Sequence, residues 1–244
     1  MANSETDLIV FHRNLRIQDN EALYYGSIRQ NYKCIYVFDK EYWSGNGKSI
    51  RQLYFLKDCL RELDDSLQNM NSKLEIFIGN YKEFYKSLLN NKFTLHFNYS
   101  TDIEYYKSQF TQFLELSKQQ HEIKVYNDFG VQRENFDRDQ WSRFWENQMN
   151  KPLCPEPKIN KASHDHNYLS THTVEEFINK YIDIQKPDFI EIQPGGSSKA
   201  EHLLETFFNE RCNGYRTKMS NPFDAKDSCS RLSPHFSFGT ISIR

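Results

Sequence analysis

Short apolar runs alternate with longer amphipathic segments through the first half of the chain. The short runs are rich in β-branched and aromatic residues, which is typical of strands, and they lie at residues 7–12, 33–38, 73–78, 94–99 and 122–126. The segments between them predict helices at residues 21–30, 49–68, 81–90 and 103–120. Strands that alternate with helices in this way predict a five-stranded, parallel, doubly wound (Rossmann-like) α/β sheet.

The second predicted helix shows the clearest periodicity. Its leucines recur at helical spacing and need only be its core face: Leu53, Leu56, Leu60, Leu63 and Leu67. No GxGxxG motif follows the first strand, so the sequence carries no dinucleotide-binding fingerprint.

From residue 128 the pattern changes. Arg138, Trp141, Trp145 and Met149 predict one aromatic helix face, which we interpret as a packing surface rather than a cofactor site. The prolines at positions 152, 155 and 157 exclude a helix and predict an extended linker. A capping-box sequence, Thr173 with Glu176, then predicts the start of a short helix.

A final helical region begins near residue 193, where two glycines precede an amphipathic segment. Its apolar face is predicted to consist of Ala200, Leu203, Leu204, Phe207 and Phe208.

Composition narrows the class of protein. A net charge of −2 argues against a basic nucleic-acid surface over the whole chain, so any such surface must be local. The five cysteines are odd in number and form no CxxC pair, which favours reduced thiols. The polar N-terminus resembles no signal peptide, and no apolar run approaches membrane-spanning length. We therefore expect a soluble cytoplasmic or nuclear protein.

A polar loop gathers His164, His166 and His172. It lacks a partnering Cys or carboxylate motif, so we expect a solvated loop rather than a metal site. No nucleophile–base pair is visible in the sequence, which argues against hydrolytic chemistry.

The link that follows the first strand reads FHRNLRIQDNEAL. Asp19 or Asn20 is a suitable N-cap for the helix that comes next. Arg13 and Arg16 follow the carboxyl end of a strand, which is where open α/β sheets bind ligands.

The last seventeen residues read SCSRLSPHFSFGTISIR. Pro234 suits the first turn of a helix, and the serines before it are candidate N-caps. A helix N-terminus with hydroxyls and free N–H groups favours phosphate binding. The alternative is an ordinary capped helix.

This segment resembles the flavin-pyrophosphate segment of the photolyase/cryptochrome family. The matching residues are Ser230, Leu232, Ser233, Pro234, Gly239, Ile241, Ser242 and Arg244. The link after the first strand resembles the opening motif of the same family, and there the matching residues are Arg13, Leu15, Arg16, Asp19, Asn20, Ala22 and Leu23. His12 and Asn14 depart from it, since the family usually has Arg and Asp at those positions.

The resemblance implies three parts: an α/β antenna domain over residues 1–130, a connector over 131–192, and the start of a helical FAD domain over 193–244. It implies FAD as cofactor, bound by Tyr215, Cys229, Ser230, Arg231, Leu232 and Ser233. Cys229 stands where many members have Thr or Ser, so a weak S–H donor replaces a hydroxyl.

A folate or deazaflavin antenna is the second cofactor that the family implies. Asn98, which ends the fourth predicted strand, is either a contact for such a ligand or a turn-forming residue. The stretch 43–48 lacks the His that folate-binding members can present there.

Light-driven repair of pyrimidine dimers in DNA is the activity that the resemblance implies, a carbon–carbon lyase reaction. In the family, most of the FAD domain follows Arg244, so we expect no catalytic residue here and no activity from this chain alone. A separate C-terminal FAD-domain polypeptide would be its partner, and damaged DNA would bind only to the assembly. The alternatives are a blue-light photoreceptor (cryptochrome), a non-catalytic chromophore- or nucleotide-binding module, and a gene remnant.

Overall fold

The computed structural model describes residues 6–29, 31–45, 48–89, 92–100, 102, 121–132, 137–158, 169–183 and 191–244. Its centre is one all-parallel sheet with the strand order β3-β2-β1-β4-β5. The strands are β1 (Thr6–Phe11), β2 (Tyr32–Phe38), β3 (Leu74–Ile78), β4 (Phe93–Asn98) and β5 (Glu122–Tyr126). This confirms the doubly wound sheet, and each strand begins and ends within one residue of its predicted bounds.

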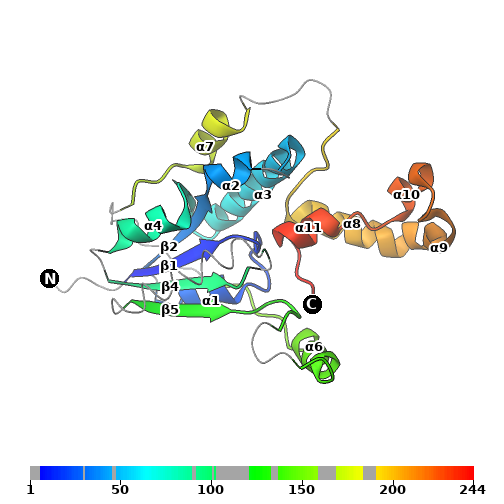
Figure 1. Cartoon of the computed structure of the whole chain (residues 1–244), viewed down its shortest axis with the longest axis horizontal. Coiled ribbons are helices and arrows are strands. Elements are labelled where there is room, and N and C mark those ends of the chain that lie inside the picture. Colours follow the sequence, from blue (N-terminus) through cyan, green and yellow to red (C-terminus); the bar gives the residue numbers. More distant parts are fainter. Residues whose placement is uncertain are drawn as a thin grey trace.

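Helices cover both faces of the sheet because successive strand residues point to opposite sides. On one face, α1 (Glu21–Gly26), α3 (Ile50–Asn69) and α7 (Val174–Tyr181) share a core cluster with Ile9 and Phe11 of β1. On the other face, α4 (Tyr81–Leu88) packs with Leu8 and Val10. All five leucines predicted as the core face of the long helix are buried, which confirms that reading. We call this body the α/β lobe (Figure 1).

Helix starts in the α/β lobe follow local capping chemistry. The Asn20 side chain accepts a hydrogen bond from the backbone N–H of Leu23, so Asn20 is the N-cap of α1. Reciprocal capping boxes open three further helices, with the pairs Ser49 and Gln52, Asn80 and Glu83, and Thr173 and Glu176. The capping box predicted at Thr173 is therefore confirmed.

One short helix was not predicted from the sequence. It is α2 (Lys40–Ser44), which directly follows β2. The Asp39 side chain caps it by accepting hydrogen bonds from the N–H groups of Glu41 and Tyr42. The helix brings Tyr42 and Trp43 to the carboxyl end of the sheet.

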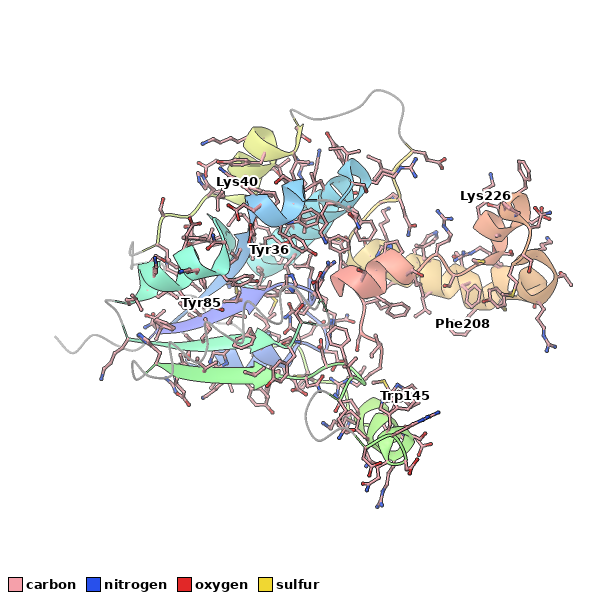
Figure 2. The ribbon with its side chains drawn as sticks, in the orientation of Figure 1. Tyr36, Lys40, Tyr85, Trp145, Phe208 and Lys226 are labelled. Atoms are coloured by element: carbon pink, nitrogen blue, oxygen red, sulfur yellow. The ribbon has the colours of Figure 1, made fainter. Side chains whose placement is uncertain are left out.

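Helix α6 (Trp141–Met149) corrects an expectation about packing. Gln148 is its buried residue, whereas Trp141 and Trp145 are 41% and 43% exposed. The Trp141 indole donates to the carbonyl of Gly130, 3.3 Å away, so one edge of the aromatic face is anchored. The aromatic face that was expected to be a packing surface is thus partly exposed to solvent. Figure 2 shows Trp145 on α6, apart from the sheet.

The C-terminal part forms what we call the helical arm, residues 197–228. It comprises α8 (Ser197–Asn209), the 3₁₀ helix η2 (Arg211–Gly214), α9 (Tyr215–Lys218) and α10 (Pro222–Ser228). The arm reaches away from the α/β lobe, and α11 (Ser233–Phe238) returns to it (Figure 1). At the base of the arm, Glu62 of α3 accepts hydrogen bonds from the backbone and hydroxyl of Ser198.

Several predictions concern residues outside the described ranges. The helix predicted over 103–120 lies there, as do His164 and His166. His172 is described, and it forms a backbone bridge with Ile76 of β3. In the described ranges, no three His, Cys, Asp or Glu residues are grouped so that they could hold a metal ion. None of the helices in those ranges is both long and apolar enough to cross a membrane.

Candidate functional site

The loop between β1 and α1 is shaped by its own amides. The Asn14 side chain accepts a hydrogen bond from the backbone N–H of His12 at 2.9 Å. The Asn20 side chain donates to the carbonyls of Asn14 and Arg16, at 3.2 and 2.9 Å. These bonds fold the loop tightly enough that Arg16 turns inward rather than toward solvent.

Arg16 is buried, and its guanidinium is fully engaged. It donates to the carbonyls of Gln18, Asp19 and Gly239 at 3.0, 2.8 and 3.1 Å. Its charge is paired with Asp128, whose carboxylate lies 2.7 Å from Nη2. A buried charge requires such a partner because desolvation is otherwise costly. Arg16 is therefore a structural cation that joins the first loop to the end of the chain.

Asp19 connects three distant segments. Its carboxylate accepts hydrogen bonds from Arg244 Nε at 3.0 Å and from the hydroxyl of Ser242. It also accepts one from the backbone N–H of Cys154 at 2.8 Å. The side chains of Asp19 and Arg244 are both almost completely buried. One carboxylate thus holds the first loop, the connector and the C-terminal segment together.

Helix α11 is fixed to the α/β lobe by its C-terminal end. The backbone N–H of Leu15 donates to the carbonyl of Phe238 at 3.2 Å. The ring of Phe238 is buried, 5.1 Å from the ring of Phe55. Gly239 ends the helix at φ +67°, and a Cβ there would lie 1.8 Å from the carbonyl oxygen of Arg13. The Gly in the family-type motif is therefore required by close approach of two backbones.

His235 lies on the buried side of α11. Its Nδ1 is 2.9 Å from the hydroxyl of Thr240, and its ring contacts that of Phe55 at 4.9 Å. Burial lowers the pKa of His235 to about 4, because the imidazolium form would have to leave water. His235 is accordingly a neutral packing residue at physiological pH.

A pH effect on stability follows from His235. In the unfolded chain a His has a pKa of about 6.5, so the unfolded state binds the proton more readily between about pH 6.5 and about pH 4. We expect the contribution of His235 to be complete above that window and to be lost as the pH falls through it. Urea unfolding at about pH 7.5 and about pH 5 measures the difference, and His235→Gln is expected to reduce it.

Two further histidines qualify the pH experiment. Burial also lowers the pKa of His12 well below its usual value, so part of the pH dependence should persist in His235→Gln. The exposed His202 provides the matched control, because His202→Gln makes the same substitution at the surface. If His235→Gln left the pH dependence unchanged, the buried neutral state of His235 would be contradicted.

The candidate flavin residues Cys229, Ser230, Arg231 and Leu232 connect α10 to α11, and Ser233 is the first residue of α11; we call these five residues the Cys229–Ser233 link. Leu232 is buried, whereas Arg231 and Ser233 are exposed. The link is braced from both sides, since Gln193 donates to the carbonyl of Arg231 at 2.8 Å and Arg211 donates to the carbonyl of Cys229.

The helix start at this link differs in detail from the prediction. Pro234 lies in the first turn of α11, as expected. The N-cap position, however, is Leu232 in a helical conformation, and no side chain caps the helix. Ser233 is the first helical residue and is exposed, and its side chain does not cap the helix. Ser233, one of the serines predicted as N-caps, is therefore an exposed residue near the exposed Arg231.

Tyr215, the sixth candidate flavin residue, lies on the helical arm. It begins α9, which contacts α10, and its ring meets that of Phe207 edge to face at 6.0 Å. The structure therefore connects Tyr215 to the Cys229–Ser233 link through α10.

Large apolar side chains are exposed on the helical arm. Phe208 and Phe223 are 66% and 85% exposed, and Met219 is exposed as well. Ala200 is the one buried residue of the apolar face that the sequence predicts for α8. Figure 2 shows Phe208 and Lys226 on the arm, distant from the α/β lobe.

A cavity of about 570 Å³ lies between the lobe and the base of the arm. Asp19, Arg244 and Glu62 line it, together with Ser198 and Met70. Its polar groups are largely those that hold the C-terminal segment against the α/β lobe. We call these contacts, of Arg16 with Gly239 and of Asp19 with Arg244, the joint, and the cavity belongs to it.

Comparison with known proteins adds independent findings. Residues 8–128 match the family model described as DNA photolyase. The (6-4)DNA photolyase of Arabidopsis thaliana is 33% identical over 89 residues, which are 32% of this chain and 16% of that protein. Cryptochrome-2 of Gallus gallus is 35% identical over 71 residues, 28% of this chain and 12% of that protein. The matched region is thus a small part of these relatives.

Solved structures resemble the chain over nearly its whole length. A photolyase from Sulfolobus tokodaii, determined with two FAD molecules, has a TM-score of 0.74 at 23% identity and is matched over 98% of this chain and 53% of its own. A class III photolyase from Agrobacterium tumefaciens has a TM-score of 0.75 at 18% identity, over 99% and 52%. At these identities the likeness shows the fold, and the chain spans about half of each structure.

The joint consists of residues from the two sequence motifs, and the first of these motifs lies inside the region that matches the family model. The opening motif lies inside the matched range and supplies Arg16 and Asp19, which bind the C-terminal motif through Gly239 and Arg244. The match over residues 8–128 and the shared fold show that this chain belongs to the DNA photolyase/cryptochrome family.

Proposed function

We propose that this chain is the N-terminal half of a flavoprotein that repairs pyrimidine dimers in DNA under light, and that a separate polypeptide supplies the rest of its FAD domain. The observation that carries the proposal is the apolar surface of the helical arm, where Phe223 is 85% exposed. In the solved photolyases the chain matches about half of the structure. In our proposal, the second polypeptide corresponds to the unmatched half and covers these exposed rings.

The joint prepares the chain for such a partner. Arg16 and Asp19 already hold the end of the chain against the α/β lobe, through Gly239 and Arg244. The arm and the Cys229–Ser233 link therefore stand on a fixed base. A second polypeptide would dock on a preformed surface, which lowers the entropy that binding costs.

The residues of the link suit the pyrophosphate of FAD. Ser230 and Ser233 offer hydroxyls, and the exposed Arg231 offers a cation. Tyr215 and Cys229 complete the set that the family resemblance implies. When bound in its reduced form, FAD would supply the light-driven electron donor, while the protein binds and orients it. The lesion must leave the DNA duplex to reach the flavin.

The flavin content of the purified chain tests this proposal. We expect the chain alone to retain no FAD through gel filtration, because the link provides contacts for the pyrophosphate and not for the rest of the cofactor. Co-expression with the product of a neighbouring reading frame that corresponds to the unmatched half should give a complex with a flavin spectrum. Stoichiometric FAD on the chain alone would contradict the need for a partner.

Blue-light signalling is the second candidate function. It is favoured by the similarity to Cryptochrome-2 of Gallus gallus and by the shared fold with a cryptochrome from Synechocystis, at a TM-score of 0.72. A repair assay distinguishes the two functions, because an assembled photoreceptor would bind flavin but leave the pyrimidine dimer in the DNA intact.

Two substitutions on the arm test the docking surface. Phe208→Ser and Phe223→Ser together should change the free energy of unfolding of the chain by less than about 0.5 kcal/mol, because both rings are exposed. They should nevertheless weaken assembly with the second polypeptide, measured by co-purification. Ile28→Ser is the matched control, since Ile28 is also exposed but lies on the α/β lobe. Equal assembly of all three proteins would contradict the docking role of the arm.

A further inference from the structure

Arg211 is the first residue of η2, and its guanidinium group connects two helices of the helical arm. Nη2 donates to the carbonyl of Leu203 and to the hydroxyl of Thr206, 3.0 Å away, both in the last two turns of α8. Nη1 donates to the carbonyl of Cys229, the C-cap residue of α10. Carbonyls at the end of a helix lack an intrahelical partner, so Arg211 supplies the donor that this end of α10 requires.

The shape of the Arg211 side chain matters as much as its charge. A guanidinium group is planar and presents its donors in a rigid fork, whereas the ammonium group of Lys is a compact point charge. Arg211 uses both terminal nitrogens of the fork, and its guanidinium carbon lies 5.8 Å from the centre of the Phe207 ring. The side chain is half-buried. A Lys at this position would not reproduce the two-sided bridge.

The Cys229–Ser233 link contains a strained residue. Arg231 has a φ of +63°, in the left-handed region that is unfavourable for a residue with a side chain. Such a conformation persists only where the surrounding structure holds it. Gln193 provides one such contact, since its side-chain amide donates to the carbonyl of Arg231 at 2.8 Å. Gly195, two positions further on, donates its backbone N–H to Asp58 of α3, so this contact comes from a segment anchored on the α/β lobe.

The two contacts hold the link on either side of Ser230. Arg211 of the helical arm binds the carbonyl of Cys229, and Gln193 binds the carbonyl of Arg231. The serine between them is one of the residues that the family resemblance assigns to FAD. Its backbone is therefore oriented before any ligand arrives, and a preorganised site binds its ligand with a smaller loss of entropy.

We propose that Arg211 is a positioning residue for the pyrophosphate of FAD. It sets the affinity for the cofactor by holding the Cys229–Ser233 link in shape, and both of its terminal nitrogens bind protein oxygens. The inference rests on the proposed function, because it requires FAD at the link. It adds a residue that belongs to neither of the two sequence motifs.

Hydrogen exchange in the whole chain tests the contact itself. In Arg211→Gln we expect the amides of residues 230–233 to exchange several-fold faster, because the carbonyl of Cys229 loses its donor. Arg216→Gln is the matched control, since it removes the same charge from an exposed position on the same arm. Equal exchange of the link in the wild-type chain and in Arg211→Gln would overturn the proposal.

Cofactor affinity in the assembly with the second polypeptide tests the consequence. We expect Arg211→Gln to weaken FAD binding about tenfold or more, the scale of one charge-assisted hydrogen bond. Arg211→Lys should weaken it to a similar degree, because the charge remains and the fork is lost. Full affinity in Arg211→Lys would show that the residue acts through charge alone, which would overturn the proposal.

Riboflavin separates positioning of the pyrophosphate from general damage to the arm. Riboflavin lacks the pyrophosphate, so Arg211→Gln should leave its affinity for the assembly unchanged. Equal losses for FAD and riboflavin would overturn the proposal. A wild-type assembly that binds no FAD would contradict the proposed function and this inference together. A wild-type assembly that binds FAD no more tightly than the Arg211→Gln assembly would overturn this inference alone.

Discussion

Replacing Asp19 by Ala is expected to lower the free energy of unfolding by about 3–5 kcal/mol, the usual cost of removing one partner from a buried ion pair. Arg244 would keep its charge in a buried position, and among the described residues its remaining acidic neighbour would be Glu21, 3.9 Å away. The hydroxyl of Ser242 and the backbone N–H of Cys154 would also lose their acceptor. The first loop, the connector and the C-terminal segment would thus lose the carboxylate that holds them together.

Urea unfolding measures this effect, and hydrogen exchange locates it. We expect residues 240–244 to exchange faster in Asp19→Ala, because the pair with Arg244 holds them. The control is Glu175→Gln, which breaks the exposed pair of Glu175 with Arg61 and should cost at most about 1 kcal/mol. If the two variants had similar stabilities, Asp19 would not be the joint that we describe.

Replacing Gly239 by Ala is the second change with a large expected effect. The left-handed conformation alone costs a residue with a side chain about 1–2 kcal/mol. The added methyl group would also lie 1.8 Å from the carbonyl oxygen of Arg13, so α11 would have to move away from the first loop. We therefore expect a loss of stability larger than the conformational term, measured by urea unfolding.

Gly214 provides the matched control for Gly239. It has an ordinary helical φ of −95°, and the atoms nearest to a Cβ there belong to the flexible side chain of Lys218. Gly214→Ala should therefore change the free energy of unfolding by less than about 0.5 kcal/mol. If Gly239→Ala were tolerated as well, the close approach of α11 to the Arg13 carbonyl would be contradicted.

Local pattern was sufficient for much of the α/β lobe. Strand positions followed from short apolar runs, and the caps at Asn20 and Thr173 followed from side chains that bind backbone groups a few residues away. The short helix α2 was missed because its five residues are too few to show a period. Its cap, Asp39 directly after a strand, was the signal that could have found it.

Partners distant in the sequence could not be predicted. Arg16 was recognised as a residue at a strand end, yet its acidic partner, Asp128, is more than a hundred positions away. The sequence predicts Asp19 or Asn20 as the N-cap, whereas the structure gives that role to Asn20 and uses Asp19 to bind Arg244. Only the fold brings these groups together, so the motifs indicated where the joint lies but not how it is made.

The proposed function is that this chain carries half of a photolyase-type repair protein. The most direct measurement is blue-light repair of an oligonucleotide that contains one cyclobutane pyrimidine dimer, with the purified chain alone and with the chain assembled with its second polypeptide. We predict that the assembly restores the two pyrimidines and that the chain alone does not, in the light or in the dark. Repair by the 244-residue chain alone would contradict the account.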